Sequence, residues 1–389
     1  MIYNKFSVIF FSNFEVKKKM WSYKNPVKIL FGNDQITCLA SIINGRQYAL
    51  VTYSDGAFED LTKSIIAQVG KPLITVKDIA PNPDRKLLST QSQRFSDLKE
   101  LPEVIIALGG GSVIDSAKVF SAAAGNFEKV ERYLKDGEAK LTLSAIPIIA
   151  IPTTAGTGSE VTSFATIWDE EHGRKFSLAH DKLYPEIAVV DPVLMLGKPH
   201  DLTLATGLDA LSHAVESIWN VNANPVSARH AVAAATTILA NLPKLLHNLD
   251  NLELRHKIAE ASLNAGLAFS NTKTAIAHNI SYPITLGWGV QHGIACSFTL
   301  PTILRSLIGL GGFRETALKQ IFGNNLETGA ENLKQFLASV GVGHRFSDQG
   351  VSETDCKKII DDAFIGERGK NFIGSKESFW EAAKQMGSL

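Results

Sequence analysis

The sequence predicts two successive domains, an α/β domain with a parallel sheet and then an all-helical domain. Short β-rich runs alternate with helical patterns through the first half of the chain, and several of these runs are continuously apolar. Strand-like runs then stop after Asp191-Pro192. This alternation is typical of a parallel sheet whose strands are buried on both faces. We therefore place an N-terminal extension at 1–20, an α/β domain at 21–200 and a helical domain at 201–389.

The spacing of apolar residues predicts each element in turn. The strand candidates are Val27–Phe31, Tyr48–Tyr53, Leu73–Val76, Val104–Leu108, Ile146–Ile151 and Ile187–Val190. The helices between them are expected near 57–70, 86–99 and 112–124. In the second half, helices are expected over 205–219, 225–246, 253–270, 293–308, 313–322, 328–340 and 353–363.

Composition excludes several classes of protein. The 389 residues include 39 basic and 39 acidic side chains, so a nucleic-acid surface or a polybasic membrane anchor is not expected. No apolar run approaches the roughly 20 residues that cross a bilayer. The three cysteines are far apart, which fits a reducing compartment, and we expect a cytoplasmic protein. Cys296 follows His292 closely, but its apolar neighbours argue against a thiolate ligand.

An acidic residue and a histidine share one face of a predicted helix. Asp209 and His213 are four residues apart in a segment with apolar residues at helical spacing. They can hold two corners of a divalent metal site, and His278 and His292 can supply two more. One carboxylate with three imidazoles suits Fe²⁺ or Zn²⁺. The plain alternative is a helix ion pair with two unrelated histidines.

The second pair of histidines is expected on two helices joined by a reversal. Residues 274–283 predict a helix that kinks or ends near Pro283, followed by a flexible loop at 287–289 and a new helix from His292. This arrangement can bring His278 and His292 to one point. A hairpin of ordinary core helices is the alternative.

A glycine run follows one of the buried strands. Val104–Leu108 leads directly into Gly109-Gly110-Gly111-Ser112 and then into a helix, an arrangement that binds phosphate through free N–H groups and the helix dipole. It is neither the six-residue dinucleotide fingerprint nor a Walker loop, and a tight turn is the alternative. A second polar loop, 152–160, follows the strand at 146–151, where open α/β sheets bind ligands. Its alternative is a helix-capping loop.

Taken together, these motifs resemble the iron-containing (group III) alcohol dehydrogenase family over roughly residues 24–310. The residues that carry the resemblance are Gly207–Glu216, His278, His292-Gly293, Gly109–Ser112 and Thr153–Glu160. The resemblance implies a dinucleotide-binding domain and a helical domain, in the two-domain architecture that dehydroquinate synthase also has. It further implies that Asp209, His213, His278 and His292 bind one Fe²⁺ or Zn²⁺ ion in the cleft between the domains.

The resemblance also implies a set of NAD(P)-binding residues. Those at the pyrophosphate and in the same cleft are Gly109, Gly110, Gly111, Ser112, Thr153, Thr154 and Thr157. Lys175 corresponds to a lysine near the cofactor ribose, Leu202 lies near the nicotinamide, and Asn82 matches another cofactor-side position. A solvated lysine and a turn asparagine are the alternatives for Lys175 and Asn82.

The sequence departs from the family pattern at two positions. Many members have a further histidine, thought to help proton transfer, where this chain has Tyr282, and a phenol is the weaker acid. Tyr282 is therefore the candidate catalytic residue. NAD-selective members tend to have an aspartate after the second strand, where this chain has Ser54, although a shift of one residue would place Asp55 there. Ser54 favours acceptance of NADPH.

The expected function is a metal-dependent NAD(P)-linked alcohol dehydrogenase that acts as an aldehyde reductase, in a homodimer. Residues 25–32 and 174–191 resemble a branch of phosphonoacetaldehyde reductases. The first alternative is a dehydroquinate synthase-like lyase, which would need a cluster of basic residues near the metal, whereas 271–292 contains only Lys273. The second alternative is a non-catalytic sensor that binds a nucleotide or metal.

Overall fold

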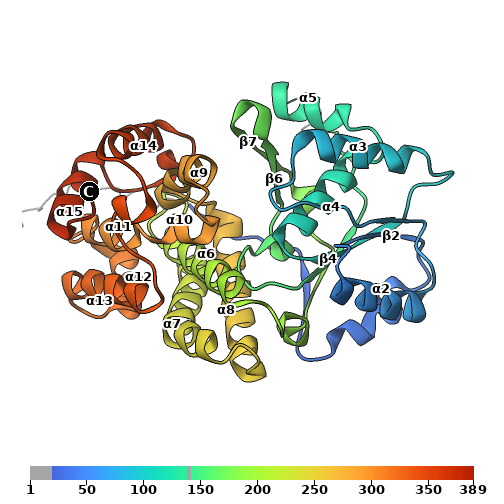
Figure 1. Ribbon diagram of the computed structural model, residues 1–389, viewed down its shortest axis with the longest axis horizontal. Helices are drawn as coiled ribbons and strands as arrows, with labels where there is room; N and C mark the ends of the chain where they lie inside the picture. The colour runs from blue at the N-terminus through green and yellow to red at the C-terminus, as the bar shows by residue number, and fades with distance from the viewer. Residues whose placement is uncertain (1–19, 138–141) are drawn as a thin grey trace, which may run out of the picture.

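A computed structural model describes residues 20–137 and 142–389 of the chain (Figure 1). The expected N-terminal extension therefore lies outside the described residues, apart from Met20. The first half forms a six-stranded sheet in the order β1-β8-β5-β4-β2-β3, and every pair in it is parallel. The strands are β1 (Lys28–Phe31), β2 (Tyr48–Val51), β3 (Ile74–Val76), β4 (Val104–Gly109), β5 (Ile148–Pro152) and β8 (Ile187–Val190). All six strands predicted from the sequence are present.

The central strand β4 is buried on both faces, which explains its uninterrupted apolar sequence. Ile105 and Ala107 face one core, which is covered by α3 (Arg85–Ser96) and α4 (Gly111–Ala123). The residues on the alternate positions face a second core, which is covered by α1 (Leu39–Ile43) and α2 (Gly56–Val69). Helix α5 (Glu128–Asp136) follows α4 and was not predicted. The alternation of side chains along a strand produces this two-sided burial.

An antiparallel hairpin, which the sequence analysis missed, interrupts the α/β pattern. Strands β6 (Phe164–Asp169) and β7 (Arg174–Ala179) pair with each other, and Gly173 has a φ of 58° in the turn. The hairpin lies on the side of the sheet domain that faces the helical domain (Figure 1). The register places Lys175 opposite Trp168. The hairpin therefore carries Lys175 toward the space between the domains.

From His200 onward, the chain is helical and has one continuous apolar core. The helices are α6 (His200–Ile218), α7 (Pro225–His247), α8 (Leu252–Thr272), α9 (Ile276–Trp288), α10 (His292–Ser297), α11 (Leu300–Ser306), α12 (Gly312–Phe322), α13 (Leu326–Ser339), α14 (Glu353–Ile365) and α15 (Lys376–Met386). The α/β and all-helical prediction is confirmed. Among the described residues, no helix combines the length and the apolar composition needed to span a membrane.

Several helix boundaries differ from the predicted ones. Helix α9 continues through Pro283 to Trp288, because Ile280 and Ile284 on either side of the proline are fully buried. The predicted loop therefore shrinks to the residues after Gly289, which has a φ of 67°. The single helix expected over 293–308 is two helices, α10 and α11. Helix α15 was not predicted, although a capping box begins it at Ser375.

Candidate metal centre and cofactor cleft

Two loops lie side by side at one edge of the sheet: the glycine turn (Gly109–Ser112) and the polar loop at 152–160, here called the threonine loop. Gly109 at the end of β4 pairs with Pro152 at the end of β5. A cleft opens beyond this edge, toward the helical domain, and holds about 170 Å³ of space. Of the sequence-predicted residues, those that line it are Asn82, Gly111, Ser112, Thr157, Lys175, Asp209, His213, His278, Tyr282 and His292. One cavity therefore contains the four predicted metal ligands and part of the predicted cofactor site.

The glycine turn needs its small residues for close packing. Helix α4 begins at Gly111, with Gly110 as its N-cap, so the free N–H groups of the first turn open toward the cleft. A Cβ added to Gly111 would lie 2.6 Å from the Thr157 side chain. The missing side chain allows the two loops to meet at the helix N-terminus. An anion held there would contact backbone from α4 and hydroxyl groups from the threonine loop.

A buried lysine fastens the threonine loop to α4. The Lys118 ammonium donates hydrogen bonds to Ser159 Oγ at 2.9 Å and to the Ser159 and Phe164 carbonyl oxygens at 2.8 and 2.7 Å. Burial lowers the pKa of Lys118 to about 8 and raises the pKa of the neighbouring Glu160 to about 7. The sequence analysis assigned no role to Lys118, although its position on the helix after the glycine run pointed toward the same loop.

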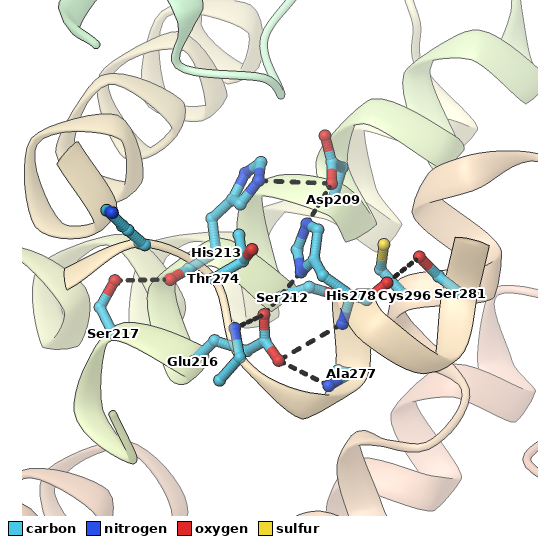
Figure 2. Close-up of polar contacts among 12 residues, drawn as sticks. Asp209, Ser212, His213, Glu216, Ser217, Thr274, Ala277, His278, Ser281 and Cys296 are labelled. Carbon is cyan, nitrogen blue, oxygen red and sulfur yellow. Dashed lines mark hydrogen bonds and ion pairs between the residues drawn. The ribbon is translucent and has the colours of Figure 1, made fainter. Parts of the chain in front are cut away.

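The predicted metal ligands converge from three helices. Asp209 and His213 lie on α6, His278 lies on α9, and His292 begins α10. Asp209 Oδ1 is 3.8 Å from His213 Nε2 and 3.4 Å from His278 Nε2. The His278 ring lies beside that of His213, with centroids 4.6 Å apart, and meets the His292 ring edge-on at 5.5 Å. Figure 2 shows Asp209, His213 and His278 grouped at one point.

The electrostatics of the cluster favour the metal-binding forms of Asp209, His213 and His292. Burial alone would lower the pKa of His278, but the neighbouring Cys296, Glu216 and Asp209 raise it well above its usual value. Burial alone would raise the pKa of the Asp209 carboxyl, but the surrounding imidazoles hold it well below its usual range. Burial lowers the pKa of His213 to about 4 and that of His292 to about 3. These two imidazoles are therefore neutral at pH 7, and a neutral imidazole is the form that binds a metal.

Two buried atoms in the cluster lack the partners that burial normally demands. Asp209 Oδ1 and His278 Nε2 make no hydrogen bond to any described residue. An unsatisfied buried polar atom costs free energy unless a ligand or ion satisfies it. Here both atoms are potential metal donors and face the same point. The residues present therefore fit a divalent cation of the Fe²⁺ or Zn²⁺ type.

Glu216 orients His278 from behind and was missed in the sequence analysis as a site residue. Its carboxylate lies 2.6 Å from His278 Nδ1 and accepts hydrogen bonds from Ala275 N and Ala277 N at 2.9 and 2.6 Å (Figure 2). A carboxylate only accepts, so Nδ1 carries the proton and Nε2 presents its lone pair to Asp209. Glu216 is fully buried one turn beyond His213, and this spacing on α6 was the available signal.

Cys296, which the sequence analysis did not expect as a thiolate ligand, lies close to the cluster. Its Sγ is 3.5 Å from His292 Nε2, and one donor atom each of Asp209, His278, His292 and Cys296 lie within 4.8 Å of one another. His213 falls outside that tighter set. Burial raises the pKa of the Cys296 thiol. The raised pKa keeps the thiol protonated, which agrees with the expectation that Cys296 is not a thiolate ligand, although the thiol faces the histidines.

The Tyr282 side chain lies beside the predicted metal ligand His292, close to the positively charged side chains of Lys175 and Arg368. Its ring stacks on that of His292 at 6.0 Å, and the Lys175 ammonium lies 3.8 Å from the phenol ring centroid. Burial raises the pKa of this phenol, but the charges of Lys175 and Arg368 outweigh burial and leave the pKa below its ordinary value. The sequence analysis did not anticipate Arg368, which is 86 residues further along the chain.

The remaining predicted cofactor residues lie outside this cleft. Thr154 and Leu202 line a separate, smaller pocket nearby. Thr153 is buried, and its N–H donates to the Gly109 carbonyl, so these two residues hold the neighbouring strand ends together. Gly110 packs against Thr154, where an added Cβ would lie 3.2 Å from its hydroxyl oxygen. Ser54 is exposed in the loop after β2, beside Asp55, which caps α2.

Comparisons with known proteins agree with this architecture. The family model described as iron-containing alcohol dehydrogenase matches residues 26–192, and the C-terminal model of the same family matches 203–375. An NAD-dependent methanol dehydrogenase from Bacillus methanolicus is 32% identical over 323 residues, which are 80% of this chain and 83% of that protein. The chain belongs to the iron-containing alcohol dehydrogenase family.

Two further members of this family bear on the chemistry. A phosphonoacetaldehyde reductase from Streptomyces viridochromogenes is 35% identical over 240 residues, which are 60% of each chain. The crystal structure of a sulfoacetaldehyde reductase from Bifidobacterium kashiwanohense in complex with NAD⁺ has a TM-score of 0.85 and 27% identity, and covers 95% of this chain and 99% of that one. The protein is an NAD-linked alcohol and aldehyde oxidoreductase, as predicted, rather than a lyase or a non-catalytic sensor.

Proposed function

We propose that the protein reduces small aldehydes to alcohols with NADH or NADPH, at a divalent metal bound by Asp209, His213, His278 and His292. The observation that supports this most directly is the pair of buried, unpartnered donor atoms, Asp209 Oδ1 and His278 Nε2, in the same cleft as the glycine turn. In the reaction, the aldehyde carbon receives a hydride and the oxygen receives a proton, so the alcohol and NAD(P)⁺ are the products.

The metal and the nicotinamide each have a chemical role in this proposal. When bound, the metal supplies Lewis acidity toward the substrate oxygen, and the nicotinamide supplies or accepts the hydride. Glu216 holds the His278 ring in its ligating tautomer. The Phe269 ring stacks on His213 with centroids 4.0 Å apart, which fixes the His213 ring plane. These contacts position the donor atoms before any ligand arrives.

Tyr282 is the proton donor in this proposal. It lines the cleft with the metal ligands, and the nearby charges of Lys175 and Arg368 make its phenol a stronger acid than an isolated tyrosine. A general acid must lie within hydrogen-bond reach of the atom that it protonates. The stacking of Tyr282 on His292 keeps the phenol beside the metal site.

The dinucleotide would run along the sheet-domain wall of the cleft. Gly111, Ser112 and Thr157 are at the α4 N-terminus for the pyrophosphate, while Asn82 and Lys175 line the same wall. Ser54 and Asp55 are the exposed positions that would decide between NADH and NADPH. We further propose a domain boundary near residue 200, a homodimeric assembly and a cytoplasmic location, which the family resemblance supports.

The proposed function is tested by following NADH and NADPH absorbance with propanal as the aldehyde. We expect turnover by the Fe²⁺- or Zn²⁺-loaded protein, loss of turnover after chelation, and recovery when the metal is returned. Metal content should be measured in the same samples. Full activity in protein free of metal would contradict the role of the metal. Failure of the loaded protein to oxidise either nucleotide with propanal or with any other short aldehyde would contradict the reductase function.

A further inference from the structure

Two cationic side chains on the helical domain line the cleft beside the metal ligands. Lys273 and Arg368 are 95 residues apart in the sequence, yet both lie on the wall formed by Thr274 and His278. Neither the Lys273 ammonium nor the Arg368 guanidinium forms a hydrogen bond or ion pair to a side chain of the described residues. Cations that line a cleft without a carboxylate partner are available to an anionic ligand.

The backbone around Lys273 is held firmly in an unusual conformation. Lys273 has a φ of 64°, which few residues other than glycine adopt. Asn220 Nδ2 donates to the Lys273 carbonyl at 3.1 Å, and two residues later Ala275 N donates to Glu216. The segment is thus fixed between the end of α6 and the carboxylate that orients His278. This conformation ends α8 and directs the chain at Lys273 into the cleft wall.

The loop that carries Arg368 is fastened to the same wall. Asn371 Nδ2 donates to the Thr274 carbonyl at 2.8 Å, and Asn279 Nδ2, on α9, donates to the Ala363 carbonyl at 2.6 Å. Arg368 is half-buried, and its charge reaches the Tyr282 phenol. Hydrogen bonds from both neighbouring segments therefore hold the chain on either side of Arg368 against the wall of the cleft.

Of the other charged groups that line the cleft, Asp209 belongs to the proposed metal site, and Lys175 and Asp115 belong to the sheet domain. The Lys175 ammonium lies on the Tyr282 ring. Asp115 accepts hydrogen bonds from Ser159 Oγ and Thr166 N at 2.6 and 2.8 Å. The glycine turn, where a nucleotide pyrophosphate would lie, is on the opposite, sheet-domain wall. Lys273 and Arg368 are therefore free for the substrate rather than for the nucleotide.

We propose that Lys273 and Arg368 bind the anionic tail of the substrate, so that the preferred substrates are short aldehydes that carry a terminal phosphonate or sulfonate. This inference rests on the proposed aldehyde reductase function. The tail is unchanged in the reaction, in which the carbonyl group alone gains a hydride and a proton. A guanidinium matches the paired oxygens of such an anion, and the ammonium adds a second charge. The two residues are specificity-determining.

Steady-state kinetics with three aldehydes tests the proposal. Phosphonoacetaldehyde and sulfoacetaldehyde carry the two anionic tails, and propanal is a neutral aldehyde of similar length. In the wild type, we expect kcat/KM to be about tenfold or more higher for at least one anion than for propanal. Arg368→Gln and Lys273→Gln should each lower kcat/KM for the anions about 10- to 100-fold more than for propanal, mainly through KM.

The matched control is Lys370→Gln, which removes an exposed cation two residues from Arg368 that does not line the cleft. It should leave all three reactions unchanged. As a binding probe that needs no reaction, methylphosphonate and methanesulfonate should inhibit propanal reduction competitively in the wild type, and more weakly in Arg368→Gln. The stronger inhibitor identifies whether the site prefers a phosphonate or a sulfonate.

The outcomes separate the two proposals. Turnover of propanal with no preference for either anion would overturn the anion site and leave the reductase function standing. A loss in Arg368→Gln and Lys273→Gln that is equal for charged and neutral aldehydes would also overturn it, because it would indicate a structural role. If the metal-loaded wild type oxidises no nucleotide with any of the three aldehydes, the reductase function itself fails.

Discussion

At the scale of single residues, the site depends on side chains that do not themselves face the substrate. Glu216 is fully buried, and its carboxylate lies 2.6 Å from Nδ1 of the His278 ring. A buried carboxylate of this kind raises the basicity of the imidazole it contacts and fixes its tautomer. The metal affinity of the site should therefore depend on Glu216 nearly as much as on the ligands.

We expect Glu216→Gln to weaken Zn²⁺ affinity by about 10- to 100-fold, because an amide can donate to His278 Nδ1 and so favour the wrong tautomer. Competition with a chromophoric chelator measures this affinity directly. Glu260→Gln, at an exposed position on α8, is the control. Equal affinity in Glu216→Gln and the wild type would show that the carboxylate does not orient the ligand.

Loss of the Tyr282 hydroxyl should lower the chemical rate. We expect Tyr282→Phe to reduce kcat for propanal by about 10²-fold or more with little change in KM, since general acids contribute on that scale. Tyr184→Phe removes a hydroxyl that contacts Ser270 outside the cleft, and serves as the control. An unchanged kcat in Tyr282→Phe would assign the proton to another donor.

At the scale of elements, close backbone contacts decide where the ligands meet. Gly293 lies directly against the Ala205 carbonyl of α6, with no room for a side chain, and this contact sets the position of His292 at the start of α10. A similar contact between Gly156 and Thr206 brings the threonine loop against α6. Single missing methyl groups thus position three segments around one point.

Gly293→Ala should push α10 away from α6. We expect it to lower the free energy of unfolding by about 1–3 kcal/mol, as overpacking does, and to reduce bound Zn²⁺. Gly287→Ala is the matched control, because an added methyl at Gly287 meets nothing within 4 Å. Chemical denaturation and metal analysis measure the two effects. Retention of full stability and full metal content in Gly293→Ala would contradict this account.

The buried Glu160 beside Lys118 gives a pH-dependent contribution to stability. Because its folded pKa is raised from 4.5 to about 7, the folded protein keeps a proton that the unfolded chain releases. Its contribution to the free energy of unfolding therefore falls as pH rises between about 4.5 and 7. In Glu160→Gln this fall should be absent, so the variant gains stability relative to the wild type across that window.

Denaturant titrations at pH 5, 6 and 7 measure this difference, and Glu59→Gln, at an exposed position, provides the control. A difference between Glu160→Gln and the wild type that stays constant with pH would contradict the raised pKa.

At the scale of the whole molecule, the sequence predicted the architecture, and the structure brings the four proposed metal donors into one cleft. Most strands of the sheet are short, largely apolar runs, and Asp209 and His213 share a helix face, so local periodicity predicted both features. The hairpin that carries Lys175 was missed because its strands mix apolar residues with charged and hydroxyl residues and form no continuous apolar run. Arg368 was beyond sequence reasoning, since only tertiary packing brings it to the cleft.

The contact between Lys175 and Tyr282 affects the binding and release of a dinucleotide. The Lys175 ammonium belongs to the sheet domain and the Tyr282 ring to the helical domain, so this contact joins the two domains across the cleft. A cation–π contact contributes about 1 kcal/mol, which favours the arrangement with the contact only about fivefold over one in which it is broken. A contact this weak can break to admit a dinucleotide without unfolding any part of the chain.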